Sequence, residues 1–402
     1  MSIPSAIALI FTLAISLIII YFTKRADKMD TAPQRLRDVN ECRNLLKSST
    51  LEQRAFPNQR LVSAFGIDNA FTTVDPILAK HFVNRSKALL KTPSEDWKKL
   101  AQFASDQAKQ FAIVKHKTSE SFPLLPMVQT LVFHVIMRKF FPQTPKPSDG
   151  DVEFVTSRIN SLWIASKGIT RQDEAHLHNQ KKELHQRLQT MFSLSESQFG
   201  HENPLNILLP AYETMWRVVL RIFLEVQFLS ASRRPLEFAE QLESFSADPT
   251  IEKFEEATRM SDGMLVSTKY IVAEGLRLYP PTRRIYREIK GEEVAVDVEC
   301  FHRDMTVWGE NALRFVPARW ASLTTNESVM RGYMPFGTGR FECPAKPSFG
   351  PFMIGIMVGV IVKSFGNRFD LIRGNKSLQK PLENGRDAYN DLRLRRKGLI
   401  SS

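Results

Sequence analysis

A single cysteine is presented by a glycine-rich loop in a pattern that could bind a metal ion. Cys343 follows Gly337 and Gly339 and precedes an apolar stretch, residues 352–360, whose composition predicts a helix. Glycine adopts backbone conformations closed to other residues and lets a flat ligand approach the chain closely. A thiolate ahead of a helix is stabilised by the helix dipole and by free backbone N–H groups. The loop therefore suits one axial bond from sulfur to a haem iron, with a small buried cysteine in a turn as the alternative.

Three charged residues upstream could form a buried electrostatic network. Glu274 and Arg277 lie three positions apart, on one face of a predicted helix, and Arg319 follows later in the chain. Guanidinium groups hold a carboxylate in a fixed geometry, and removing one member of a buried network costs about 3–5 kcal/mol. The alternative is an exposed helix pair worth about 0.3–0.5 kcal/mol.

Several short motifs occur in a fixed order around these residues. Glu274-x-x-Arg277 is followed by Leu278-Tyr279-Pro280-Pro281, His302-Arg303-Asp304, Trp308-Gly309, Phe315-x-Pro317-x-Arg319 and the loop from Phe336 to Cys343. This series resembles the C-terminal half of cytochrome P-450, the family of haem-thiolate monooxygenases. The resemblance covers residues 200–365 and is specific, because all the pieces stand in the family's order.

The resemblance implies a fold and a cofactor. The expected fold is mainly α with a small β part, the cytochrome P-450 fold. Cys343 would be the metal ligand, giving its thiolate to the iron of haem b. Glu274, Arg277 and Arg319 would form the charge triad that braces the haem pocket.

An acid–alcohol pair lies where the family's long central helix is expected. By resemblance, Glu213 and Thr214 would be catalytic residues that relay protons while dioxygen is activated. Two structural alternatives remain open at this point. Glu213 could form a local salt bridge or cap, and Thr214 could bond back to its own helix.

The haem propionates require basic partners, and the resemblance suggests three. His81 and Arg85 match the family's propionate-binding helix, and Arg340 lies in the cysteine loop. The loop departs from the family at Phe341, where a basic residue is usual, and at Ala345, where a glycine is usual. These departures resemble divergent fungal microsomal members that act in secondary metabolism.

Composition limits the compartment and the partners. The 402 residues contain three cysteines, Cys42, Cys300 and Cys343, which leaves no disulfide framework and no paired zinc-binding motif. This favours a reducing compartment. The net charge of +12 favours an anionic partner surface such as a membrane or an acidic protein. The sequence has no nucleic-acid-binding motif, so no nucleic acid partner is expected.

An uncharged apolar run, residues 3–22, predicts a single-pass membrane anchor. About 20 residues span the hydrocarbon core of a bilayer. Lys24, Arg25 and Lys28 follow directly, which places the rest of the chain in the cytosol, on the endoplasmic-reticulum membrane. A cleaved signal peptide is the alternative, but it normally has a basic start and a shorter apolar core.

The remaining pattern is that of one catalytic domain. We expect the anchor to occupy residues 1–23 and the catalytic domain to occupy residues 24–402. The N-terminal lobe of this domain is expected to be abbreviated. Within it, residues 56–71 would supply one strand or two short ones. The strand signal is clearest where Val294 and Val296 alternate with other residues. Helices are expected over residues 75–91, 94–114, 126–141, 152–191, 205–228 and 267–278.

The expected function follows from the resemblance. The enzyme would oxidise a small apolar molecule with dioxygen, taking electrons from NADPH through the NADPH–cytochrome P-450 reductase. Secondary-metabolite biosynthesis is the expected setting. Two alternatives stay open: a haem-thiolate isomerase or dehydratase that needs no reductase, and a truncated haem-binding protein without catalysis.

Overall fold

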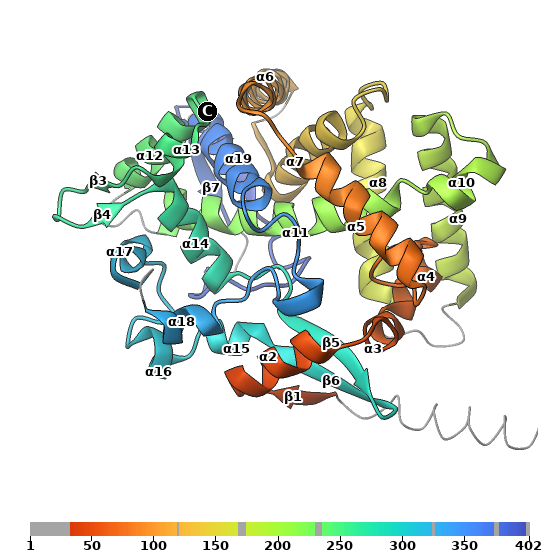
Figure 1. Cartoon of the computed structure of the whole chain (residues 1–402). Coiled ribbons are helices and arrows are strands. Elements are labelled where there is room, and N and C mark those ends of the chain that lie inside the picture. The colour runs from red at the N-terminus through yellow and green to blue at the C-terminus, as the bar shows by residue number, and fades with distance from the viewer. Residues whose placement is uncertain are drawn as a thin grey trace, which may run out of the picture.

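The computed structural model shows a mainly helical molecule with three small sheets among its described residues (Figure 1). The structure describes residues 33–118, 120–167, 174–229, 235–323, 326–373 and 378–398.

Two long apolar helices form the centre of the molecule. α11 (Leu205–Leu224) and α19 (Phe349–Phe365) pack against each other, and nearly every residue of α19 is buried. A helix that is apolar on all sides must be covered on all sides. α7 (Leu124–Phe140) covers α11, and α6 (Ser94–Thr118) and α12 (Pro235–Ala247) cover α19. This core fixes the helices around the candidate site.

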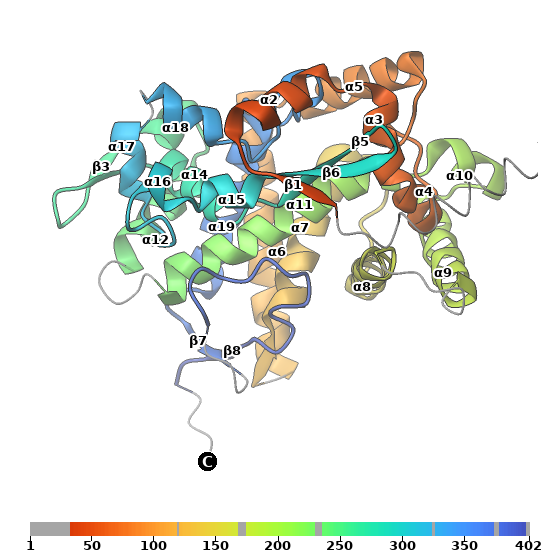
Figure 2. The same ribbon diagram turned by 90° about the horizontal axis from the view of Figure 1, so that it is seen from below.

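The other helices surround this centre (Figures 1 and 2). The sequence-predicted helices are all found, and the charged stretch 152–191 is divided into two, α8 and α9. A π-helical segment, Glu225–Leu229, continues α11. The remaining helices are α2 (Val39–Ser48), α3 (Leu51–Ala55), α4 (Gln59–Phe65), α5 (Pro76–Leu90), α8 (Asp149–Ala165), α9 (Glu174–Phe192), α10 (Glu196–Glu202), α13 (Ile251–Glu255), α14 (Thr268–Leu278), α15 (Val298–His302), α16 (Met305–Trp308), α17 (Trp320–Leu323) and α18 (Glu327–Gly332).

The sheets are short and lie at the edges of the helical core (Figure 2). β5 (Arg284–Ile289) and β6 (Glu292–Asp297) form an antiparallel hairpin, and β1 (Gln34–Leu36) pairs with β6 in parallel. The strand expected around Val294 is therefore confirmed as β6. The second sheet has the order β2 (Ser121–Pro123), β8 (Arg393–Arg396) and β7 (Phe369–Ile372), and a two-stranded ladder joins β3 (Thr258–Arg259) to β4 (Leu265–Val266).

The strands expected between residues 56 and 71 are wrong, because residues 56–65 are helical and residues 66–71 form an irregular turn. α4 buries Leu61, Ala64 and Phe65, which follow helical spacing. Gly66 ends the helix in the left-handed conformation, with a φ of 63°. The side chain of Asn203 then donates to the carbonyls of Phe65 and Gly66 at 3.1 and 3.0 Å, which ties the segment to the start of α11.

The predicted membrane anchor, residues 3–22, lies outside the described residues. Within the described ranges, no helix combines the length and apolar character needed to cross a bilayer.

Candidate functional site

Glu274 and Arg277 form a fully buried ion pair on α14. Nε and Nη2 of Arg277 donate to the two carboxylate oxygens of Glu274 at 2.8 and 2.9 Å. Nε of Arg319 donates to the same carboxylate at 3.1 Å, and the indole N–H of Trp320 donates to it at 3.0 Å. The structure thus brings together the three charged residues that the sequence singled out, and it adds Trp320 as a fourth partner.

The remaining donors of Arg277 are also used. Its Nη1 donates to the carbonyls of His302 and Ala312 at 2.5 and 2.7 Å. Both Glu274 and Arg277 have side chains that are 0% exposed, so these bonds replace the water that the charges have lost. Burial lowers the pKa of Arg319, and the charge of Glu274 opposes that shift. The group is a closed structural network rather than a reactive one.

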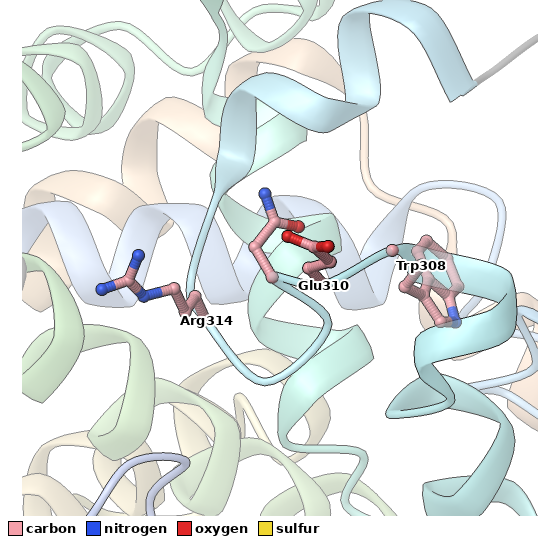
Figure 3. A pocket seen from close by; sticks show the side chains of 5 residues that line it. Trp308, Glu310 and Arg314 are labelled. Carbon is pink, nitrogen blue, oxygen red and sulfur yellow. The ribbon is translucent and has the colours of Figure 1, made fainter.

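An open surface pocket of about 630 Å³ lies over the loop that wraps this network (Figure 3). The side chains of Trp308 and Arg314 point apart on either side of Glu310. Arg319 donates to the carbonyls of Trp308 and Asn311 at 3.0 and 2.9 Å, so the backbone of the loop is hydrogen-bonded to the network. The pocket is lined by Trp308, Gly309, Glu310, Asn311 and Arg314, which differ from the residues expected to do chemistry.

His302 connects the charge network to the loop that carries Cys343. Its Nδ1 lies 3.0 Å from the carbonyl oxygen of Arg277, and its Nε2 accepts a hydrogen bond from the backbone N–H of Met334 at 2.9 Å. Since a carbonyl only accepts and an N–H only donates, the ring carries its proton on Nδ1 and is neutral. Burial and the charge of Arg277 lower the pKa of His302 to about 3. The neutral ring holds the start of the loop in place.

Two glycines shape the loop ahead of Cys343. Gly337 and Gly339 have φ values of 71° and 74°, in the region that favours glycine. A Cβ on Gly339 would lie 2.9 Å from Cα of Lys47 in α2, so glycine also permits close packing there. The backbone N–H of Cys343 donates to the carbonyl of Phe336 at 2.9 Å and closes the loop.

Cys343 is exposed as a residue, although protein atoms crowd around its sulfur. Burial by the surrounding protein raises the pKa of Cys343, whereas the backbone N–H of Ala345 and the charge of Arg54 lower it. α19 begins only at Phe349, so the donor near the sulfur is Ala345. A coordinating metal removes the thiol proton, which makes this sulfur a suitable ligand.

Two buried arginines near this loop have no carboxylate partner among the described residues. Arg54 on α3 places its guanidinium 4.4 Å from the ring centroid of Phe71 and 4.6 Å from that of Phe341. Arg287 on β5 lies 5.6 Å from the ring of Phe341, and its Nε has no hydrogen-bond partner within the described ranges. Burial and the charge of Arg287 lower the pKa of Arg54 to about 9. Such a pair can hold anionic groups such as propionates.

The three basic residues expected from the sequence lie differently. His81 and Arg85 are exposed on α5. Arg340 is exposed too, although its guanidinium lies 5.4 Å from the ring of Phe341, beside the buried pair. Their contact with a haem stays a prediction.

Arg54 and Arg287 were missed by the sequence analysis. Arg287 could have been noticed in the sequence, because it takes the place of an apolar residue between Ile285 and Ile289 on one face of the strand. Arg54 could not have been noticed, because the polar residues around it are typical of a surface helix.

The acid–alcohol pair of α11 is already engaged in local contacts. The hydroxyl of Thr214 donates to the carbonyl of Pro210 at 3.1 Å, within its own helix. Glu213 is buried and forms an ion pair with Arg386 of the C-terminal segment. Both structural alternatives for these residues are therefore present, and the proton relay stays a prediction.

Comparisons with a family model and with curated proteins both find similarity to cytochromes P450. Residues 255–380 match the family model described as Cytochrome P450. A cytochrome P450-like protein of Acanthamoeba polyphaga mimivirus is 30% identical over 107 residues, which cover 24% of this chain and 23% of that protein. A putative cytochrome P450 of Caenorhabditis elegans is 37% identical over 87 residues, 18% of this chain and 16% of that protein. A cytochrome P450 of Arabidopsis thaliana is 27% identical over 179 residues, 38% of this chain and 36% of that protein.

The chain therefore spans no more than about a third of the length of these curated relatives in sequence. The structural likeness extends much further. The crystal structure of CYP175A1 from Thermus thermophilus covers 90% of this chain and 88% of its own, with a TM-score of 0.61 and 16% identity. A six-coordinated cytochrome P450 from another strain of the same bacterium covers 90% and 92%, with a TM-score of 0.59 and 16% identity. Residues 255–380 are therefore similar in sequence to the cytochrome P450 family, and the chain shares the fold of the solved cytochromes P450.

Proposed function

We propose that this chain is a haem-thiolate monooxygenase that oxidises a small, largely apolar molecule with dioxygen and electrons from NADPH. The observation that carries the proposal is the exposed residue Cys343, on a loop next to two buried arginines that have no carboxylate partner in the described part of the chain. Structural ion networks do not leave buried cations unpaired, whereas a binding site for an anionic ligand does.

The haem that the family implies fits these residues. Cys343 would hold the iron through its sulfur, and Arg54 and Arg287 would hold the two propionates. The glycines of the loop leave room for a flat ring to approach the backbone. When bound, the haem supplies the redox-active iron for dioxygen chemistry.

Glu213 and Thr214 are the proposed proton-handling pair. Thr214 can hold a proton at its hydroxyl once it turns from the carbonyl of Pro210, and Glu213 can supply one once it leaves Arg386. Thr214→Ala should keep the haem and still bind substrate, while coupling of NADPH use to product falls. Coupling equal to that of the parent protein would remove the pair from the mechanism.

A second candidate is a haem-thiolate isomerase or dehydratase that needs no reductase. The ion pair between Glu213 and Arg386 favours it, because an acid held by a guanidinium is a poor proton donor. Product analysis with and without NADPH and a reductase separates the two candidates.

The setting of the reaction is also proposed. The apolar run of residues 3–22 and the cations Lys24, Arg25 and Lys28 support an anchor in the endoplasmic-reticulum membrane, with residues 24–402 as a cytosolic domain. The net charge of +12 suits an acidic reductase as electron donor. A role in secondary metabolism, and the fungal character of the loop, rest on the sequence departures alone.

The decisive experiment is a reduced carbon-monoxide difference spectrum of the purified chain. The parent protein should show the absorption band typical of a thiolate ligand, and Cys343→Ser should abolish it. Cys300→Ser, which changes a cysteine outside the loop, should leave the band intact. A thiolate band that persists in Cys343→Ser, or no haem in the parent protein, overturns the proposal.

A further inference from the structure

A second group of cations surrounds Trp163, at the end of α8 and away from Cys343. The guanidinium carbon of Arg386 lies 4.2 Å from the ring centroid of Trp163, and that of Arg60, on α4, lies 5.6 Å from it. Lys167 follows two residues after the end of α8. Two arginines from separate segments therefore lie over one aromatic ring, and Lys167 is close enough to both for their charges to act on it.

The backbone of the segment that carries Arg386 is hydrogen-bonded to α11. Arg217 of α11 donates to the carbonyl of Asn384 at 2.6 Å, and Arg221 donates to the carbonyl of Gly385 at 2.7 Å. Arg221 also donates to the carbonyl of Glu383 at 2.9 Å, so the three residues before Arg386 are each fixed to α11. The backbone leading to Arg386 is thus fixed, and only 7% of the Arg386 side chain is exposed.

The group carries more positive than negative charge. Glu213 pairs with Arg386, and Glu293 acts on Arg60 from a distance. The strongest charges acting on Lys167 are all cations, those of Arg386 and Arg60 foremost. Burial and these charges lower the pKa of Lys167 to about 8. A buried guanidinium next to two more cations is costly unless a further anion neutralises it.

The cations adjoin the one partly exposed face of α11. Asn206, Pro210, Thr214 and Arg217 are partly exposed, and they follow helical spacing on a helix that is otherwise nearly all buried. Arg217 is the member of this face that contacts the segment carrying Arg386. A ligand lying along this face beside Thr214 would reach the cations with one end.

We infer that the molecule oxidised by this protein carries a carboxylate, which Arg386, Arg60 and Lys167 bind against Trp163. This inference rests on the proposed function for the reaction, but the binding itself needs no electrons. Arg386 already forms an ion pair with the carboxylate of Glu213, so its guanidinium can pair with a carboxylate from a ligand instead. Glu213 is then the competitor that the ligand displaces. The substrate is therefore an acid with an apolar body.

The test compares acids with their uncharged amides. Indole-3-acetic acid, 4-phenylbutyric acid and lauric acid, each with its amide, are titrated calorimetrically into the purified full chain. At least one acid should bind about tenfold or more tightly than its amide, which corresponds to a charge-assisted bond. Inorganic phosphate, titrated in parallel, should bind more weakly than the preferred acid.

Four variants assign the preference to this site. Arg386→Gln and Arg60→Gln should each reduce the acid preference about tenfold. Glu213→Gln should raise affinity for the acid and leave that for the amide unchanged, because it removes the competing carboxylate. Arg158→Gln, on the same helix as Trp163 but paired with Glu183, should change neither.

The outcomes are separable from those of the proposed function. No acid preference in the parent protein, equal or tighter binding of phosphate, or an acid preference unchanged in both Arg386→Gln and Arg60→Gln overturns the inference. The carbon-monoxide spectrum tests the haem thiolate independently of these titrations. Glu213→Gln also controls for misfolding, because a misfolded variant could not show the tighter binding of the acid that is predicted for it.

Discussion

The imidazole of His302 accepts a hydrogen bond from the backbone N–H of Met334 at 2.9 Å. The other ring nitrogen meets the carbonyl of Arg277 at 3.0 Å, so one neutral side chain joins the buried charge network to the loop that presents Cys343. The position of the sulfur therefore depends on a network that never touches it.

Lowering the pH should destabilise the protein through His302. In the unfolded chain a histidine titrates near 6.5, whereas burial and Arg277 lower the pKa of His302 to about 3 in the folded protein. The unfolded chain then binds more protons between these values, so stability falls as the pH drops from about 6.5 toward 3.

The slope should approach about 1.4 kcal/mol per pH unit for this one group. Urea unfolding at pH 7, 6 and 5 measures it, and His302→Asn should remove that part of the slope. His178→Asn, at an exposed position on α9, should keep it. Equal slopes for the parent protein and His302→Asn would show that the ring does not stay neutral.

Alanine should be tolerated unequally at two glycines with similar φ values. Gly339 and Gly309 have φ values of 74° and 77°. A Cβ on Gly339 would meet Cα of Lys47 at 2.9 Å, whereas one on Gly309 would meet nothing within 4 Å. Gly309 has a ψ of −178°, so Gly309→Ala should cost only the strain of this positive-φ, extended backbone, about 1–3 kcal/mol. Gly339→Ala should add about 1–3 kcal/mol for the clash. Equal losses in denaturant unfolding would show that packing on α2 is unimportant.

Replacing Arg287 by methionine should stabilise the haem-free protein and weaken its hold on haem. The guanidinium of Arg287 is buried with Nε unbonded, so its removal relieves a desolvation cost. The same change removes a partner for a propionate. Thermal unfolding of the haem-free protein and haem transfer to apomyoglobin measure the two effects. Arg395→Met, at an exposed position of β8 in the other three-stranded sheet, should change both little. A variant that loses stability in the haem-free state would contradict this account.

Glu274 and Arg277 should behave as one unit. Glu274→Ala and Arg277→Ala should each cost about 3–5 kcal/mol, because each leaves buried partners unpaired. The double variant should cost much less than the sum, since the first change already breaks the network. The exposed pair Lys269–Glu255 is the control, worth about 0.2–1 kcal/mol. Additive losses measured by urea unfolding would argue against a shared network.

The fold could be predicted where local pattern and burial agree. Asp75 and Pro76 mark the start of α5 in the sequence, and the structure has Asp75 as the cap. The apolar run of α19 is equally clear. Residues 56–71 were mispredicted because Phe65 and its neighbours contact α9 and the start of α11, and such long-range packing decides between strand and helix.

The candidate site was predicted only where residues interact along a local motif. Glu274 and Arg277 share one helix face, so their spacing in the sequence predicts their contact. Arg54 and Arg386 could not be placed from the sequence, because each meets its neighbours through segments far apart in the chain. Arg386 in particular lies far from Glu213 in sequence, and only the folded C-terminal segment brings them together.

The pairing of β1 with β6 has a consequence for how the chain is made. Gln34 is aligned with Val294, so an early segment finds its partner only after most of the chain has left the ribosome. At roughly 5–20 residues per second, β1 must wait for tens of seconds without its partner strand. Contacts of such separation also slow folding, since a long loop must close before they form. The edge next to the cysteine loop therefore assembles late, and until then β1 is exposed to chaperones and proteases.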